Sequence, residues 1–180
     1  GIQCIQWHAL SQQLIVAYNN SSIDIIHGDQ FYKINDIQLT NLYADNTIND
    51  IYLLDKWALV ATNFGIVVID IEKREIKDTW FPNNNRQSSI TYQVSTTKDS
   101  LYAATEQGIY TAPIINNWLV PNQWSNLSAF NNLGIKKITK QQAVVYAYNN
   151  GAIYQLPNPI PFAGFSNQQI RKIVAGTDGM

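Results

Sequence analysis

Apolar and polar segments alternate regularly along this chain, and the clearest example lies between Trp57 and Asp70. Two apolar runs flank a short turn at Asn63 to Gly65. Apolar runs of this length, separated by a turn that contains glycine, are typical of a β-hairpin. No segment keeps the 3.6-residue periodicity of a helix. The sequence therefore predicts an all-β fold in which helices are scarce.

The same hairpin pattern occurs four times at a nearly constant spacing. The first apolar run of each copy contains an alanine, and successive alanines are 44, 43 and 43 residues apart: Ala17, Ala61, Ala104 and Ala147. Four positions further along lie the residues of the expected turns: Ser21, Gly65, Gly108 and Gly151. Glycine is expected at three of these turns because a tight hairpin needs positive φ there.

Each repeat also carries a strand before the hairpin and a more polar strand after it. The preceding strands are predicted at 2–5, 48–51, 92–94 and 135–138, and the outer strands at 31–34, 75–81 and 123–127. Four strands in about 43 residues are the period of a β-propeller blade. The predicted blades span about 1–40, 45–82, 90–130 and 133–165. A β-sandwich ranks well behind, because it would not keep a fixed 43-residue register.

The distribution of apolar residues also fits a propeller. The middle strands, such as 58–62 and 66–69, are apolar on both faces, as expected for strands that pack between neighbouring blades. The outer strand carries Glu75, Lys77 and Asp78, as expected at the rim. Trp57 opens a middle strand, and we expect it to pack between blades.

The C-terminal part departs from the regular pattern. Residues 170–173 resemble the first strand of a further blade at 168–180, but they trail Ile138 by only 35 residues. The outer strand of the fourth blade should therefore be short, and three prolines, which only an edge strand tolerates, fall there: Pro157, Pro159 and Pro161. Four blades and one strand make a poor closed ring, so we interpret 1–180 as one domain, a fragment of a larger, seven-bladed propeller.

An open fan of blades exposes the apolar faces of its terminal blades. We expect these faces to contact the remaining blades or to cause self-association. The chain opens directly in a strand pattern at Ile2, without a signal peptide or a membrane-spanning run, as expected of a piece of a longer protein.

The charge of the chain and its lack of catalytic motifs exclude several classes of function. Only 14% of the residues are charged and the net charge is -1, and the densest basic clusters are two residues long. Nucleic acid is therefore not an expected partner. The single cysteine, Cys4, is interpreted as a buried structural thiol, and His8 and His27 as residues at the ends of strands. The chain contains no Gly-x-Ser-x-Gly, phosphate-loop or HExxH motif.

The oxygen-rich loop from Asp45 to Asp50 lacks the ligand spacing of a calcium-binding loop. We interpret it as a connecting turn in which side chains bond the local backbone. We predict no catalytic residue, no metal site and no cofactor. The candidate ligand-binding residues are Trp118 and Trp124, which flank Pro121 in a longer insertion and could stack on sugar rings. The alternative, an aromatic residue that anchors the outer strand, is favoured.

At this point two segments resemble a known family. Residues 63–79, NFGIVVIDIEKREIKDT, resemble the N-terminal β-propeller of PorZ proteins of the type IX secretion system. Residues 100–110, SLYAATEQGIY, are similar to a later blade of that propeller and to the two-component-regulator propeller repeat. The likeness runs from Ile2 to about Leu127.

The resemblance implies a non-catalytic surface protein with two propellers and a C-terminal secretion domain, of which this chain is one incomplete propeller. It implies a location outside the outer membrane, a sortase as a partner, and a role in supplying the anionic lipopolysaccharide to which cargo is attached. The resemblance assigns no ligand-binding residue to this chain. We therefore expect a non-enzymatic scaffold or binding module. The alternative is a periplasmic glycan-sensing propeller of a hybrid two-component regulator, in which a membrane span and a kinase follow.

Overall fold

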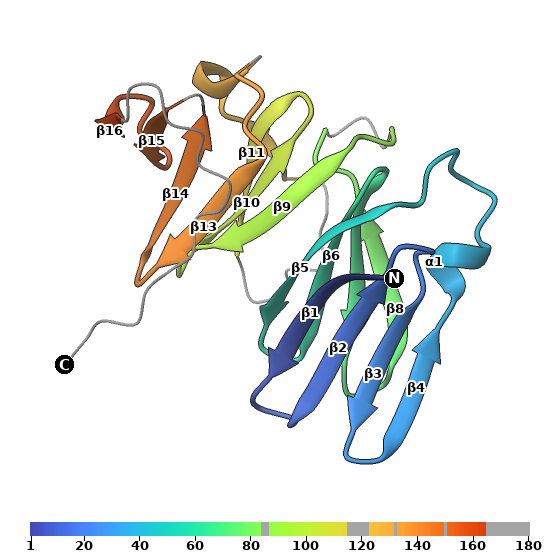
Figure 1. Cartoon of the computed structure of the whole chain (residues 1–180). Coiled ribbons are helices and arrows are strands. Elements are labelled where there is room, and N and C mark those ends of the chain that lie inside the picture. The colour runs from blue at the N-terminus through green and yellow to red at the C-terminus, as the bar shows by residue number, and fades with distance from the viewer. Residues whose placement is uncertain (84–86, 115–122, 132, 150, 165–180) are drawn as a thin grey trace.

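The computed structural model describes residues 1–83, 87–114, 123–131, 133–149 and 151–164. Four antiparallel sheets of four strands each follow one another along the chain and are arranged as a fan (Figure 1). The only helical elements in these residues are the short α1 (Asp36–Leu39) and a 3₁₀ turn at Ser128–Phe130. The predicted all-β fold with four four-stranded blades is confirmed.

The four sheets are called blades 1 to 4 below. Blade 1 contains β1 (Ile2–His8), β2 (Gln13–Tyr18), β3 (Ile23–His27) and β4 (Gln30–Ile34). Blade 2 contains β5 (Ile48–Leu54), β6 (Trp57–Thr62), β7 (Gly65–Asp70) and β8 (Glu75–Trp80). Blade 3 contains β9 (Thr91–Thr96), β10 (Ser100–Thr105), β11 (Gly108–Pro113) and β12 (Ser125–Asn126). Blade 4 contains β13 (Lys137–Gln141), β14 (Val144–Asn149), β15 (Ala152–Gln155) and β16 (Pro161–Gly164).

Each pair of neighbouring blades shares one apolar core. Alternate residues of a strand point to opposite faces of the sheet, and blade 2 shows the result. Ala58 and Val60 join the core shared with blade 1, whereas Leu59 and Ala61 join the core shared with blade 3. A third core lies between blades 3 and 4. Both faces of the middle strands are therefore buried, as the sequence predicts.

The expected hairpin turns have the expected backbone conformation. All four marked residues have positive φ: Ser21, Gly65, Gly108 and Gly151. In blade 2 the hydroxyl of Thr62 donates to the carbonyl oxygen of Gly65 at 3.0 Å and accepts the N–H groups of Phe64 and Gly65. A Cβ atom on Gly65 would lie 2.5 Å from the carbonyl oxygen of Trp80. The turn therefore requires glycine for its φ of 152° and for space.

The sequence repeat is misaligned by one residue in blade 4. Ala147 pairs with Ile138, just as Ala103 pairs with Val94. Ala147 therefore corresponds to Ala103 and not to Ala104, and its side chain lies in the core shared with blade 3. Because side chains alternate between faces, a shift of one residue exchanges the two faces of the strand. The spacing of the alanines therefore predicts the blade period correctly, but it assigns Ala147 to the wrong face of its strand.

The outer strands also differ from the prediction in length. The outer strand of blade 3 was expected at 123–127, but only Ser125 and Asn126 pair with β11. In blade 4, β16 begins at Pro161 and pairs only with β15, so this proline lies on an edge strand as predicted. The expected first strand of a further blade, at 168–180, lies outside the described residues.

Candidate functional site on the open face of blade 1

The inner strands β1, β5, β9 and β13 line a cavity of about 420 Å³ along the axis of the fan. Its polar side chains connect neighbouring blades. Gln93 donates through Nε2 to Oδ2 of Asp50 at 3.0 Å, and its Oε1 accepts the backbone N–H of Ile138 at 2.9 Å. The hydroxyls of Tyr52 and Thr96 lie 2.9 Å apart across the same gap between blades 2 and 3. These contacts fix the spacing of the blades and give the cavity a structural role.

Cys4 lies in this cavity beside Asp50. It is half-buried, less than the sequence predicted, because it borders the axial cavity. Burial, and secondly the nearby carboxylate of Asp50, raise the pKa of the Cys4 thiol to about 12. At neutral pH the thiol is protonated, and a protonated thiol is a poor nucleophile and metal ligand.

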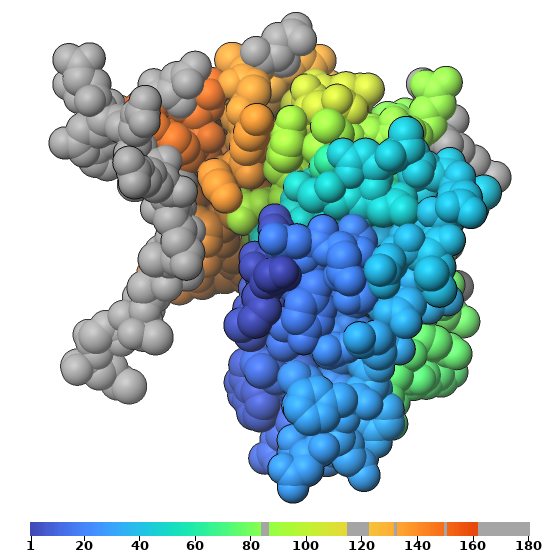
Figure 2. Space-filling model, turned by 45° about the vertical axis from the view of Figure 1, so that its right-hand side comes forward, coloured from blue at the N-terminus to red at the C-terminus, as the bar shows by residue number. Residues whose placement is uncertain are grey.

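The face of blade 1 that is turned away from blade 2 is covered by no other described blade. We call it the open face. It carries Ile5, Trp7, Val16, Asp24 and Phe31, which are placed there by strand register. In Figure 2, blade 1 (blue) lies in front of blade 2 and presents a broad surface to the viewer.

The open face matches the faces that blades 2 to 4 bury. In each blade one residue of the inner strand pairs with the corresponding residue of the second strand: Ile5 with Val16, Ile51 with Val60, Val94 with Ala103, and Ile138 with Ala147. Ile51, Val94 and Ile138 are 1%, 3% and 5% exposed, because each packs against the preceding blade. Ile5 is 50% exposed. The open face is therefore a blade-packing face without its partner.

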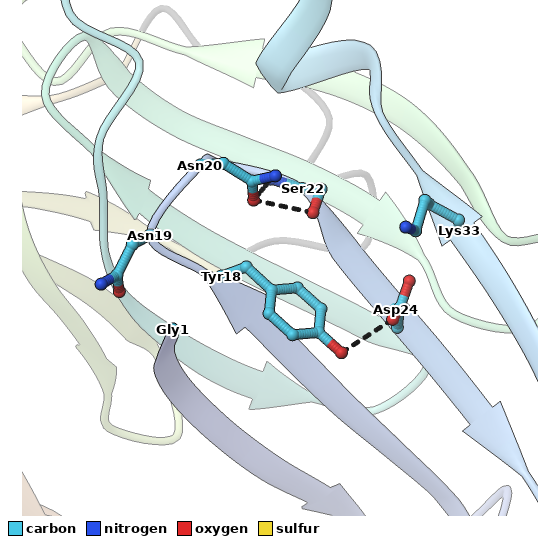
Figure 3. A pocket seen from close by; sticks show the side chains of 7 residues that line it. All are labelled: Gly1, Tyr18, Asn19, Asn20, Ser22, Asp24 and Lys33. Carbon is cyan, nitrogen blue, oxygen red and sulfur yellow. Dashed lines mark hydrogen bonds between the residues drawn. The ribbon is translucent and has the colours of Figure 1, made fainter.

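The open face is hollowed at the end of the blade that holds the β2–β3 turn. A cavity of about 540 Å³ lies there, and Figure 3 shows the residues that line it: Gly1, Tyr18, Asn19, Asn20, Ser22, Asp24 and Lys33. The phenol of Tyr18 donates to Oδ2 of Asp24 at 2.8 Å. This hydrogen bond, and secondly burial, raise the pKa of Tyr18. Asp24 is only 9% exposed, and its Oδ1 has no hydrogen-bond partner.

The sequence analysis did not single out Asp24, although a signal was present. Asp24 pairs with Val16 in the register in which Val67 pairs with Val60 in blade 2 and Tyr110 pairs with Ala103 in blade 3. A carboxylate thus replaces an apolar or aromatic residue in an otherwise apolar run. This substitution is identified when the residues that occupy the same position in the strand pairing of each blade are compared.

The predicted ligand-binding tryptophans do not form a site in the described residues. Trp118 lies outside them. Trp124 is 3% exposed and packs in the core between blades 2 and 3, which corrects the surface candidate and agrees with the favoured alternative, an aromatic residue that anchors the outer strand. Trp124 directly precedes β12, the outer strand of blade 3. Trp57 packs against the same core, as predicted.

The remaining candidates have local structural roles. His8 ends β1 and is buried, with ring nitrogens that contact the hydroxyl of Ser11 and the carbonyl oxygen of Asp55. His27 ends β3 and is exposed. In the oxygen-rich loop, Oδ1 of Asp45 accepts the N–H of Thr47 at 2.9 Å, which is the local bonding that the sequence predicts.

The hydrogen bonds from Thr47, and a further one from Asn63, lower the pKa of Asp45. Among the described residues, no group of three or more His, Cys, Asp and Glu side chains could hold a metal ion. No helix in this part of the chain is long and apolar enough to span a membrane.

Four stacked four-stranded blades around an axis define the chain as part of a β-propeller. The family described as the N-terminal β-propeller domain of PorZ, of the type IX secretion system, matches residues 1–125. The chain belongs to this family. No curated protein sequence matches the chain.

Solved structures show the same fold at low identity. PorZ of Porphyromonas gingivalis is 18% identical, with a TM-score of 0.74 over 86% of this chain. The extracellular domain of a putative hybrid two-component system from B. thetaiotaomicron is 13% identical, with a TM-score of 0.64 over 92% of this chain. The dihydro-heme d1 dehydrogenase NirN is 11% identical, with a TM-score of 0.65 over 91% of this chain. The chain spans 21%, 24% and 37% of the lengths of these proteins.

Proposed function

We propose that this chain is part of a non-enzymatic cell-surface propeller, a scaffold or binding module of the type IX secretion attachment complex. The observation that carries the proposal is the family match over residues 1–125. The P. gingivalis relative is described as an essential bacterial surface component of that secretion system, which supports a location outside the cytoplasm. The proposed partners are a sortase and anionic lipopolysaccharide, which the scaffold helps to deliver to the sortase.

The architecture suits rigid presentation of loops. The long connections between blades lie at the same end of the strands as the β2–β3 and β6–β7 turns, and loops held on stiff sheets are the usual location of binding residues (Figure 1). At this end Leu39 and Leu42 are 71% and 82% exposed. Next to them the ring of Tyr43 stacks on Phe64 at 4.0 Å. We name Leu39, Leu42 and Tyr43 the loop surface and propose it as the contact for a protein partner.

The test is capture of sortase and of lipopolysaccharide by the intact protein from which this chain comes. We expect both to be retained, and we expect the double variant Leu39→Ser/Leu42→Ser to lose most of the sortase. The matched control is Ile160→Ser, which replaces an apolar residue of similar exposure in blade 4. Retention of neither sortase nor lipopolysaccharide by the unmodified protein would contradict the proposed function. Equal loss in the control would contradict the loop surface alone.

The alternative function, a periplasmic glycan sensor of a hybrid two-component regulator, is supported by the fold shared with the B. thetaiotaomicron domain. At 13% identity this likeness concerns the fold only. The two functions differ in what the longer gene encodes. A kinase after the propeller would favour the sensor, and a second propeller with a C-terminal sorting domain would favour the scaffold.

A further inference from the structure

We propose that a further blade of the same repeat, from the longer protein, covers the open face of blade 1 and places a hydrogen-bond donor side chain against Asp24. This inference rests on the part of the proposed function that makes the chain one portion of a larger propeller. It adds the chemistry of one contact at the seam between blade 1 and the covering blade, which we call the closing seam.

The occupant follows from the repeat. The faces equivalent to the open face in blades 2, 3 and 4 are each buried against a preceding blade of the same repeat. Blade 1 presents the same type of face, with Ile5 and Val16 at the positions of Ile51 and Val60. The chain spans only 21% of the length of its PorZ relative, so a longer protein of that kind has ample sequence for further blades. A blade of the same repeat fits this surface better than an unrelated partner.

Asp24 makes this seam different from the others. At the equivalent position blade 2 carries Val67, which lies in an apolar core. Asp24 is already only 9% exposed, and a covering blade removes the exposed surface that remains. A buried carboxylate oxygen without a hydrogen bond is strongly unfavourable, so a donor must meet it. The hollow of about 540 Å³ beside Asp24 provides room for an arginine, lysine or amide side chain.

Donors within blade 1 do not meet this need. Tyr18 already bonds Oδ2 of Asp24, which leaves Oδ1 without a partner. Lys33 is the cross-strand neighbour of Asp24, but it is exposed and no ion pair between the two is found in the described residues (Figure 3). The unmet acceptor therefore points to the covering blade. A polar contact of this kind also favours the correct closure over other pairings of similar apolar faces.

The experiment compares Asp24→Val in two proteins, the 180-residue chain and the full-length protein, by thermal unfolding. Valine is the residue at the equivalent position of blade 2. In the 180-residue chain we expect an unchanged or higher Tm, because removal of the buried, unpaired Oδ1 offsets the loss of the hydrogen bond from Tyr18. In the full-length protein we expect a Tm lower by several degrees, because the donor of the covering blade loses its acceptor. The opposite signs are the signature of the proposed contact.

The control is Lys33→Met in both proteins, which we expect to leave Tm within about one degree. A drop in the full-length protein as large as that of Asp24→Val would show that Lys33 is the partner and would overturn the proposal. Equal effects of Asp24→Val in both proteins would also overturn it.

The 180-residue chain can associate through the apolar residues of the open face without a donor for Asp24. A second copy that supplies this donor, instead of a further blade, would make Asp24→Val destabilise the 180-residue chain by an amount that grows with protein concentration. That result would overturn the proposal as well. Because Tm is measured without sortase or lipopolysaccharide, loss of capture in the functional test leaves this result unaffected.

Discussion

Ile5 in β1 and Ile138 in β13 occupy equivalent positions in the first and fourth blades, but Ile138 is 5% exposed and Ile5 is 50% exposed. The two residues have the same side chain and the same position in the inner strand of their blades. They differ in that blade 3 packs on the face of Ile138, and no described blade packs on the face of Ile5. Whether the isoleucine at this position is buried therefore depends on whether another blade packs on its face.

This relationship predicts how the 180-residue chain behaves in solution. The open face should associate with a second molecule through its exposed apolar residues on β1, and a charge among them should weaken the association. We expect Ile5→Asp to shift the chain towards the monomer in sedimentation velocity at high concentration, without loss of the strand signal in circular dichroism. The matched control is Leu10→Asp, in the turn between β1 and β2, where the side chain is 79% exposed. A monomeric unmodified chain at all concentrations would contradict the prediction.

The second prediction concerns Trp124. Because its side chain fills the core between blades 2 and 3, Trp124→Ala should lower the free energy of unfolding by about 3–5 kcal/mol. Trp7→Ala on the open face should change it by no more than about 0.5 kcal/mol, since Trp7 is 57% exposed. Urea denaturation followed by circular dichroism measures both. A small effect at Trp124, with loss of sugar binding instead, would restore it as a ligand-binding candidate.

Two features of the sequence were sufficient to predict the architecture. Alternation between apolar and polar positions identifies strands, and a period of about 43 residues identifies blades. Leu59 and Val60 illustrate why both faces could be predicted: adjacent apolar residues in a strand must point to opposite sides, and each side needs a neighbouring blade. Residues far apart in the chain were thus assigned to shared cores without any structure.

Three features could not be predicted from the same pattern. Alanine fits on either face of a blade, so Ala147 did not reveal that blade 4 is displaced by one residue in the repeat. Trp124 follows an insertion that has no counterpart in the other repeats, so the repeat period does not place its side chain. Asp24 is 9% exposed and accepts a hydrogen bond from Tyr18, and the alternation of apolar and polar residues indicates neither feature.

The third prediction concerns the tight turn of blade 2. Gly65→Ala should lower the free energy of unfolding by about 2–3 kcal/mol, because the new Cβ would meet the carbonyl oxygen of Trp80 at 2.5 Å. Gly28→Ala is the matched control. Gly28 has a φ of 57° but no atom near its added Cβ, so its cost of about 1 kcal/mol comes from the backbone conformation alone. If Gly65→Ala and Gly28→Ala lowered the free energy of unfolding equally in urea denaturation, the backbone at Trp80 would have moved to make room for the new Cβ.

The last prediction concerns the pH dependence of Cys4. The thiol has a pKa of about 12 in the folded chain, against 9.0 for an unperturbed thiol. At pH 8 the folded chain should therefore react with iodoacetamide on the order of 1000-fold more slowly than the chain unfolded in urea, because only the thiolate reacts.

The same shift links stability to pH. Folding favours the protonated thiol, so this contribution to stability is fully present below pH 9 and is lost as the pH rises towards 12. Asp50→Asn removes the smaller of the two causes, and the pKa should fall but stay above 9.0, because burial remains. Alkylation rates between pH 7 and 11, measured for the unmodified chain and for Asp50→Asn, test this order of the two causes. Reaction of the folded chain at the unfolded rate would show that Cys4 is accessible and that burial does not control its pKa.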